Sequence, residues 1–369
     1  MLLSFNCSRL LHIMKNSFIT KLKKIRTSYK LIKGVRKNIR MINTERDLTR
    51  EQESEIKEYY RNLLGIDAPL DWHRYFYKRT GVYSVRYIPT SLYYTEIIGK
   101  INQMKFERAY SDKNLTEFLL TGIRQPETIL KNMNGHYYLN GTTVDKETAI
   151  QACWNLDDVI IKPSLERHGS GVKKFSVKDG ITSINNESVE RLFSRYQADF
   201  LVQKVVHQHR LLSDLNPSSV NTIRILSYRS GMEVLVPYTV IRIGRKGWDI
   251  DNETAGGISS RINADGTLAR YAFGAPGNDM IEKTDTGIIL EGYRIPSYEK
   301  AIETVKGLHL QSPHFNLIGW DISIDEDGEP VLIEWNVWPE LSQSANGPAF
   351  GDYTERILKE IWNRPNTIY

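Results

Sequence analysis

The stretch FNLIGWDISIDEDGEPVLIEWNVWPE, residues 315–340, predicts a β-hairpin. Leu317–Ile324 and Val331–Trp335 are apolar and rich in β-prone residues, as buried strands are. Between them lies a polar segment centred on Asp327-Gly328, a dipeptide that favours tight hairpin turns because its backbone tolerates positive φ. We expect the rest of the fold to be organised around this hairpin.

The predicted hairpin brings two carboxylates together. With a two-residue turn at Asp327-Gly328, paired residue numbers sum to 655, and Asp321 lies opposite Glu334. Since side chains alternate between the faces of a strand, Asn336 shares the face of Glu334. Close carboxylates repel unless a proton or a cation neutralises them, and carboxylate and amide oxygens suit Mg²⁺ or Mn²⁺. The alternative is a solvated edge hairpin, but the apolar neighbours favour a buried hairpin and hence a metal site.

The spacing of these three residues resembles that of a known family. An Asp, a Glu thirteen residues later and an Asn two residues after that, inside a strand–turn–strand, are similar to the metal-binding end of ATP-grasp enzymes. Together with GWDISI, LIEWN and the PAFG segment at Pro348–Gly351, they resemble the sugar-transfer-associated ATP-grasp group, with its glutathione-synthetase-like ATP-binding domain. The resemblance covers about residues 106–365.

This resemblance implies an α+β fold, in which two α+β subdomains with antiparallel sheets clasp ATP and follow a small, mainly helical N-terminal region. It divides the chain into a basic tail (1–44), a helical region (45–105), a nucleotide-binding subdomain (106–202) and a metal-binding and catalytic subdomain (203–369). The sequence itself predicts a helix over residues 44–64, capped by Thr44 or Asp47 and ended by Gly65.

Two lysines and a glycine loop form the predicted phosphate site. Lys162 ends the apolar run DVIIKP, so its charge either reaches solvent or meets a ligand phosphate. The following loop contains Gly169, Ser170 and Gly171, whose backbone N–H groups can form a nest around phosphate. An ordinary hairpin turn is the alternative. The resemblance implies the ATP-grasp phosphate loop, and by position it gives a contact with ATP to Lys113, which could otherwise be a surface ion-pair residue.

The strand FLVQKVVH matches the hinge between the two ATP-grasp subdomains. The resemblance implies that the backbone of Lys204–Val206 holds the adenine edge, with Gln203 beside it where the family usually has an acid. His207 and His209 are candidates for the ribose contact, and each could equally be structural.

Arginines interrupt two further predicted strands. Arg224 lies within NTIRILS and Arg242 ends VLVPYTVIR, and a charge within a sheet needs an anionic partner, either a core carboxylate or a ligand phosphate. The resemblance implies that both are catalytic residues facing the triphosphate and an acyl phosphate, and that Asn252 acts from a double-glycine lid loop at residues 249–257. Some carboxylate–amine ligases have an Arg two residues before the metal Asp. Here that residue is Gly319, so Arg242 or Arg224 must supply the charge.

The composition is that of an ordinary globular protein, with 40 % hydrophobic and 25 % charged residues. Cys7 and Cys153 form neither a metal motif nor a disulfide framework, which indicates a reducing, cytoplasmic compartment. No apolar run is long enough to span a membrane, and polar residues interrupt Met1–Met14, so neither a transmembrane helix nor a signal peptide is expected.

Residues 1–44 contain eleven Lys and Arg and no Asp or Glu, interleaved with apolar residues. Such a segment is either a solvated, loosely helical tail or a peripheral contact with the anionic inner face of a membrane. It contains no base-reading module, so nucleic acid is not an expected partner.

These features predict phosphoryl transfer from ATP bound with two Mg²⁺ or Mn²⁺ ions. The resemblance implies that the acceptor is a carboxylate, on a small molecule or a lipid-linked saccharide, and that an amine then attacks the acyl phosphate to give an amide, ADP and phosphate. The expected role is in surface polysaccharide or glycoconjugate biosynthesis. The alternatives are an ATP-grasp kinase that phosphorylates a sugar or an alcohol, and a nucleotide-binding protein without turnover.

Overall fold

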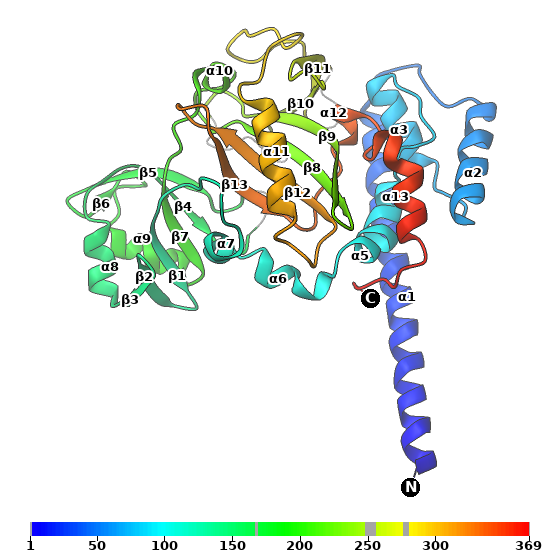
Figure 1. The fold of residues 1–369 in the computed structure, drawn as a ribbon, viewed down its shortest axis with the longest axis horizontal. Coiled ribbons are helices and arrows are strands. Elements are labelled where there is room, and N and C mark those ends of the chain that lie inside the picture. Colours follow the sequence, from blue (N-terminus) through cyan, green and yellow to red (C-terminus); the bar gives the residue numbers. More distant parts are fainter. Residues whose placement is uncertain (1, 167–168, 248–255, 276–279, 369) are drawn as a thin grey trace. The chain divides into compact units, whose positions relative to one another are not determined.

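The computed structural model describes residues 2–166, 169–247, 256–275 and 280–368, with side chains from residue 19 onward. The chain forms two compact units, residues 1–105 with 347–369 and residues 106–346. The first unit consists of helices, and the second holds two β-sheets with their covering helices (Figure 1).

The helices of the first unit come from both ends of the chain. They are α1 (Leu2–Met41), α2 (Arg50–Leu64), α3 (Asp71–Thr80), α4 (Thr90–Leu92), α5 (Ile98–Ile101) and α13 (Thr354–Ile361), with a π-helical turn at Tyr93–Ile97 and 3-10 turns at Met104–Phe106 and Gly351–Tyr353. Among the described residues, no helix combines the length and the apolar character needed to cross a bilayer.

The C-terminal part of α1 belongs to the core of the first unit. Val35 is 1 % exposed and packs, with three partly buried neighbours, against an aromatic cluster. The neighbours are Leu31, Ile39 and Ile42, and the cluster is Trp72, Tyr75, Phe76 and Tyr87. The predicted tail is therefore wrong for residues 31–42, because apolar residues spaced four apart lie on one helical face and pack there.

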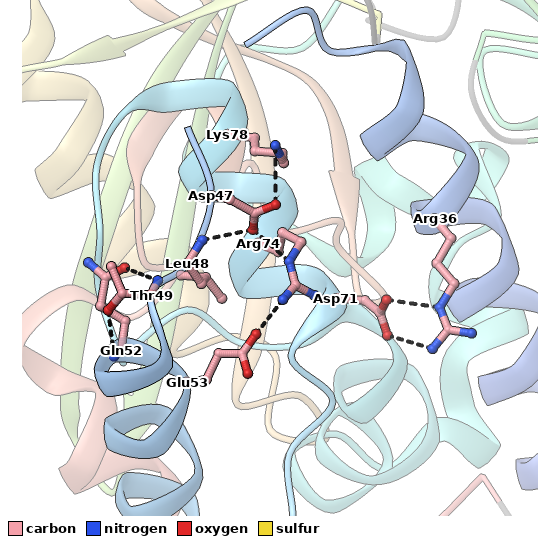
Figure 2. Close-up of polar contacts among 9 residues, drawn as sticks. All are labelled: Arg36, Asp47, Leu48, Thr49, Gln52, Glu53, Asp71, Arg74 and Lys78. Carbon is pink, nitrogen blue, oxygen red and sulfur yellow. Dashed lines mark hydrogen bonds and ion pairs between the residues drawn. The ribbon is translucent and has the colours of Figure 1, made fainter. Parts of the chain in front are cut away.

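Helix α2 is capped by Thr49 rather than by the predicted Thr44 or Asp47. The Thr49 hydroxyl accepts a hydrogen bond from the Gln52 N–H, and the Gln52 side chain accepts one from the Thr49 N–H, which is a reciprocal capping box. Asp47 instead forms an ion pair with Arg74 of α3 at 2.7 Å (Figure 2). The local pairing of the cap with its third residue decides where this helix begins.

The C-terminal helix α13 packs on α2. Glu355 accepts hydrogen bonds from the Tyr59 hydroxyl and from Arg86, while Ile357, Leu358 and Ile361 are fully buried. The sequence places residues 347–369 in the metal-binding subdomain, but they belong to the first unit. Chain order alone cannot reveal this return, because the apolar face of α13 would suit either unit.

The first sheet of the second unit has seven antiparallel strands in the order β3-β2-β1-β7-β4-β5-β6. They are β1 (Thr128–Met133), β2 (His136–Leu139), β3 (Thr142–Val144), β4 (Leu156–Pro163), β5 (Lys173–Lys178), β6 (Ile181–Thr182) and β7 (Phe200–Lys204). Helices α8 (Lys146–Ala152) and α9 (Val189–Tyr196) cover one face and pack against Val159, Ile161 and Val202 (Figure 1). The alternating residues Lys162, Leu201 and Gln203 point to the other face.

The second sheet has six antiparallel strands in the order β11-β10-β9-β8-β12-β13. They are β8 (Thr222–Ser230), β9 (Glu233–Ile243), β10 (Ile258–Ile262), β11 (Leu268–Phe273), β12 (Leu317–Ile324) and β13 (Pro330–Asn336). Helix α11 (Tyr298–His309) lies across one face and forms the main core with it (Figure 1). Short helices complete the unit: α6 (Glu107–Tyr110), α7 (Thr116–Leu119), α10 (Arg210–Ser213), α12 (Gln343–Asn346) and a 3-10 turn at Lys113–Leu115.

The β12–β13 hairpin pairs Asp321 with Glu334 as predicted, but not through a two-residue turn. Its loop has three residues and ends with Gly328 at φ 81°, so the pairs next to the loop, such as Ile322 with Leu332, are shifted by one residue. A β-bulge reverses that shift: Ile333 of β13 is the extra residue, opposite the step from Asp321 to Ile322. The three-residue loop and the bulge shift the register in opposite directions. Asp321 and Glu334 therefore face each other as predicted.

Candidate active site

Charged residues of the candidate site lie on the face of the six-stranded sheet opposite α11. Along β8 and β12, core residues that pack towards α11 alternate with Arg224 and Asp321, which therefore point to the other face. Arg224, Asp321 and Glu334 are successive partners across β8, β12 and β13. The sheet register thus places one cation and two carboxylates in a row.

Asp321 is held in a buried ion pair. Arg224 Nε and Nη2 donate hydrogen bonds to its Oδ1 and Oδ2 at 2.6 and 2.7 Å. Arg242 Nη1 lies 3.4 Å from Oδ1, and Asn336 Nδ2 lies 3.4 Å from Oδ2. Burial raises the pKa of the Asp321 carboxyl, but the charges of Arg224 and Arg242 outweigh this effect and hold the pKa below its usual value. Asp321 is therefore ionised.

Arg224 occupies space that Gly319 leaves open. A Cβ atom on Gly319 would lie 2.8 Å from Pro339 Cβ and 3.3 Å from Arg224 Nη1. The guanidinium of Arg224, from the neighbouring strand β8, therefore lies beside the position of residue 319. Two of its guanidinium nitrogens donate to both oxygens of Asp321, so of the two anionic partners expected for Arg224 the structure shows the core carboxylate.

Arg242 has hydrogen-bonding capacity left. Its side chain is 14 % exposed, and among the described residues its Nε has no hydrogen-bond partner. Its contact with Asp321, at 3.4 Å, is longer than an ordinary charge-assisted hydrogen bond. A buried guanidinium N–H without a partner costs free energy, so Arg242 suits an anionic ligand at this face.

Lys113 links Glu334 to the segment that follows β4. Its Nζ lies 3.2 Å from Glu334 Oε1 and donates a hydrogen bond to the Glu166 carbonyl at 2.7 Å. The preceding Asp112 accepts a hydrogen bond from the Asn114 N–H and caps the 3-10 turn that begins with Lys113. The Asp-Lys pair thus combines a cap with a cation directed to the site.

Lys162 shares a small cleft with Lys113 and Glu334. The cleft has a volume of about 20 Å³, roughly enough for one water molecule, and Gln203 and Trp335 also line it. Burial and repulsion from Lys113 lower the pKa of Lys162 to about 8, against the opposing effect of Glu334. Two lysines beside one carboxylate leave a positive charge that an anionic ligand would neutralise.

The predicted phosphate loop adopts the backbone for which its glycines are suited. Gly169 and Gly171 have φ values of 70° and 74°, on either side of the exposed Ser170. The Tyr196 hydroxyl donates a hydrogen bond to the Gly171 carbonyl, which fixes the end of the loop against α9. Such a backbone can present N–H groups to an anion.

The predicted hinge residues differ in whether their hydrogen-bonding groups already have partners within the protein. The Gln203 side chain donates hydrogen bonds to Thr128 Oγ1 and to the Pro126 carbonyl, at 3.0 and 3.3 Å. Lys204 is exposed, and its N–H donates to the Glu127 carbonyl, whereas no described backbone hydrogen bond uses the Val206 N–H. Val206 therefore keeps the donor that the predicted adenine contact requires.

Of the two histidine candidates for the ribose contact, His209 has a structural role. Its Nδ1 accepts a hydrogen bond from the Leu211 N–H and caps α10. Asn252 and most of the predicted lid loop lie outside the described residues. Of that loop, Gly256 is exposed at φ 96° and Gly257 is buried.

The predicted metal residues fit a hard divalent cation. Asp321, Glu334 and Asn336 offer two carboxylates and an amide, and Arg224 uses only one acceptor direction of each Asp321 oxygen. Among the described residues, no group of three or more His, Cys, Asp or Glu could hold an ion. A metal here would therefore depend on Asn336 and on ligand oxygens. Mg²⁺ is usually bound in this way, by one or two carboxylates together with substrate phosphates.

One protein family model matches most of the chain. The family model described as sugar-transfer associated ATP-grasp matches residues 93–358. The chain belongs to this family. The match confirms the predicted family and the α+β ATP-grasp fold, and it spans both sheets of the second unit. None of the curated proteins compared with this chain matches it.

Several solved structures are similar to this ATP-grasp chain at low sequence identity. An L-amino acid ligase from Bacillus licheniformis is 12 % identical with a TM-score of 0.36, over 72 % of this chain and 50 % of that one. A D-alanine–D-alanine ligase from Helicobacter pylori is 14 % identical with a TM-score of 0.39, over 75 % and 67 %. A D-cycloserine synthetase is 11 % identical with a TM-score of 0.41, over 70 % and 73 %. The ATP-grasp chain thus spans half the length of the first of these proteins.

Two contributions to the candidate site are not predicted from the sequence. One is the space left by Gly319, which admits Arg224, and the other is the carbonyl of Glu166, which fixes Lys113. A glycine inside a buried strand indicates that another group approaches closely, so Gly319 carried a usable signal. A backbone acceptor such as the Glu166 carbonyl leaves no trace in the residue types.

Proposed function

We propose that the protein is an ATP-dependent carboxylate–amine ligase that forms an amide through an acyl phosphate. The observation that supports this most is the convergence of Lys113, Lys162 and Glu334 on one cleft, beside the Asp321–Arg224 pair. These residues offer cations for a triphosphate and carboxylates for the divalent metal ion bound with it. Membership of the family adds the ATP-grasp fold.

Each residue then has a distinct part. Lys113, Lys162 and the Gly169–Gly171 backbone bind and orient the phosphates of ATP. Asp321, Glu334 and Asn336 would hold Mg²⁺ or Mn²⁺, which supplies charge neutralisation at the phosphate oxygens. Arg224 keeps Asp321 in place and ionised.

Arg242 is the residue proposed to receive the second substrate. Its free guanidinium Nε suits the substrate carboxylate and, later, the acyl phosphate. A carboxylate oxygen attacks the γ-phosphorus and ADP leaves. The amine nitrogen then attacks the acyl carbon, phosphate leaves with the C–O bond electrons, and the nitrogen loses a proton. Closure of the site must keep water away from the acyl phosphate.

The acceptor is proposed to be a carboxylate on a saccharide or an amino acid. The family description, sugar-transfer associated, supports a role in surface polysaccharide or glycoconjugate biosynthesis. A lipid-linked saccharide is one form that such an acceptor could take.

The reaction is tested by measuring ADP release from ATP with a panel of carboxylates, each with and without amines. A ligase releases ADP only when a matched carboxylate is present and gives an amide when the amine is added. ADP release with an alcohol or a sugar, and a stable phosphorylated product, would replace the ligase by a kinase. Nucleotide binding without any ADP release over the whole panel would favour a protein without turnover.

Lys162→Met is expected to weaken ATP binding by about 10- to 100-fold, because a charge-assisted hydrogen bond to phosphate is worth about 1.5–3 kcal/mol. The same lysine gives the binding a pH dependence. Its pKa is about 8 in the free protein, and a bound triphosphate raises it, so ATP affinity should fall as the pH rises above about 8. Calorimetry in buffers of different ionisation enthalpy would show proton uptake on binding.

Lys178→Met is the matched control for this lysine, because Lys178 is exposed at the end of the neighbouring strand β5. Its affinity and proton uptake should equal those of the wild type. Lys113→Met should also weaken binding, since its charge faces the same cleft. Unchanged proton uptake in Lys162→Met would show that Lys162 does not meet the phosphates.

Gly171→Ala is expected to distort the phosphate loop and lower ATP affinity. The new Cβ would lie 2.8 Å from Pro163 Cγ, and its backbone would stay at φ +74°, which costs a non-glycine residue about 1–2 kcal/mol. Gly141→Ala separates the two effects, because Gly141 has φ +77° and nothing within 4 Å of the added Cβ. If both variants lose the same stability and both bind ATP normally, the contact with Pro163 has no role in the loop.

A further inference from the structure

The helix α1 carries an apolar stripe that nothing in the described structure covers. Ile19, Leu22, Ile25 and Tyr29 are 40, 50, 56 and 68 % exposed, and they follow one another at spacings of three, three and four residues. This spacing places them on one face of the helix. These four residues form the α1 stripe.

The same helix is attached to its unit by other residues. Val35 is buried in the aromatic cluster, Lys24 pairs with Glu96 at 2.9 Å, and Arg36 pairs with Asp71 at 2.9 Å (Figure 2). The α1 stripe therefore belongs to a fixed, folded helix of 40 residues, about 60 Å long, and not to a loose tail.

Basic residues surround the α1 stripe and no acid is present. Residues 19–41 contain nine Lys and Arg and no Asp or Glu. Eight of the nine are exposed: Lys21, Lys23, Arg26, Lys30, Lys33, Arg36, Lys37 and Arg40. Among the described residues, the ion pairs of this helix use Lys24, which is partly buried, and Arg36. The apolar face thus lies within a strongly positive surface.

We infer that α1 binds peripherally to an anionic lipid surface, independently of the proposed ligase function. Apolar side chains on a basic helix can enter the boundary between headgroups and acyl chains, while Lys and Arg contact the anionic headgroups. A second copy would bring two positive helices together, which charge repulsion opposes. Nucleic acid would match the charge but would leave the α1 stripe in water.

The test is partition of the full-length protein onto phosphatidylcholine vesicles with and without roughly one-third phosphatidylglycerol. The wild type should bind the anionic vesicles, bind neutral ones weakly and dissociate as salt rises. Lys30→Gln, Lys33→Gln and Lys37→Gln together should reduce partition on the order of 100-fold, at about fivefold for each charge. Leu22→Ser, Ile25→Ser and Tyr29→Ser together should reduce it at least tenfold.

Matched controls come from exposed residues elsewhere in the chain. Lys178→Gln, Lys283→Gln and Lys359→Gln remove the same charge, and Val82→Ser, Met232→Ser and Ile289→Ser remove similarly exposed apolar groups. Both control sets should bind vesicles like the wild type. Because every substituted residue is exposed, unchanged thermal unfolding would show that all variants fold.

Three results would overturn the inference: equal binding to neutral and anionic vesicles, equal losses in the α1 and control variants, or no vesicle binding at low salt. Sedimentation equilibrium tests whether a second copy of the chain covers the α1 stripe instead of a lipid surface. A dimer of the wild type that the α1 apolar variant dissociates, without vesicle binding, would assign the α1 stripe to a second copy.

Discussion

Asp321→Asn is expected to lower the free energy of unfolding by about 3–5 kcal/mol and to abolish ATP turnover. The substitution leaves the guanidinium of Arg224, which is 3 % exposed, as a buried charge without its carboxylate. It also removes one of the two proposed carboxylate ligands. Urea unfolding measures the first effect, and ADP release measures the second.

Adding Arg224→Met to Asp321→Asn separates these two effects. The double variant has no unpaired buried charge and should recover at least about half of the lost stability, but turnover should stay absent. Asp327→Asn is the exposed counterpart, because Asp327 is 74 % exposed and pairs with Arg124, and it should cost less than about 1 kcal/mol. Wild-type ADP release by Asp321→Asn would refute the metal assignment, and a stability cost equal to that of Asp327→Asn would refute the importance of the buried pair.

Glu334→Gln is expected to reduce ATP turnover by about 100-fold or more while the protein stays folded. The substitution keeps the shape of the side chain but removes a proposed ligand. Its side chain is 31 % exposed and pairs with Lys113, so stability should fall by no more than about 1 kcal/mol. The repulsion expected between Asp321 and Glu334 does not arise, because Arg224 and Lys113 neutralise them.

Glu329→Gln, on the same hairpin, is the matched control for this carboxylate. The Glu329 side chain is 34 % exposed and pairs with Lys300 at 2.6 Å, so it differs from Glu334 in position rather than in exposure or pairing. Turnover by Glu329→Gln should be that of the wild type. Glu334→Gln should also lower the pKa of Lys162 further, because Glu334 raises that pKa. Turnover near the wild-type value in saturating Mg²⁺ would rule out Glu334 as a ligand.

The sequence predicts the antiparallel hairpin and the partnership of Asp321 with Glu334, because both depend on apolar strands around a turn. It does not predict the three-residue loop or the bulge, since both depend on local backbone conformations that several residue types can adopt. The predicted partners are correct because the two deviations have opposite signs. A loop of three residues without the bulge would have paired Asp321 with residue 333.

The sequence leaves the anionic partner of Arg224 undecided for a different reason. Charge within a strand indicates that an anion is needed, but a core carboxylate and a ligand phosphate satisfy the same requirement. Only the register of β8 against β12 decides for Asp321. For α1, in contrast, the spacing of Leu31, Val35 and Ile39 already indicated a packed face, and the high density of lysines obscured it.

The bulge at Ile333 has a consequence for sequence comparison. Leu332 belongs to the core with Ile322, whereas Glu334 faces the site with Asp321, although two residues this close on a regular strand would share a face. A homologue that lacks Ile333 could keep every one of these pairs. An alignment without a gap at that position would then shift all the strand residues before it by one and exchange inward with outward side chains. In this strand, the single-residue gap belongs between Leu332 and Glu334.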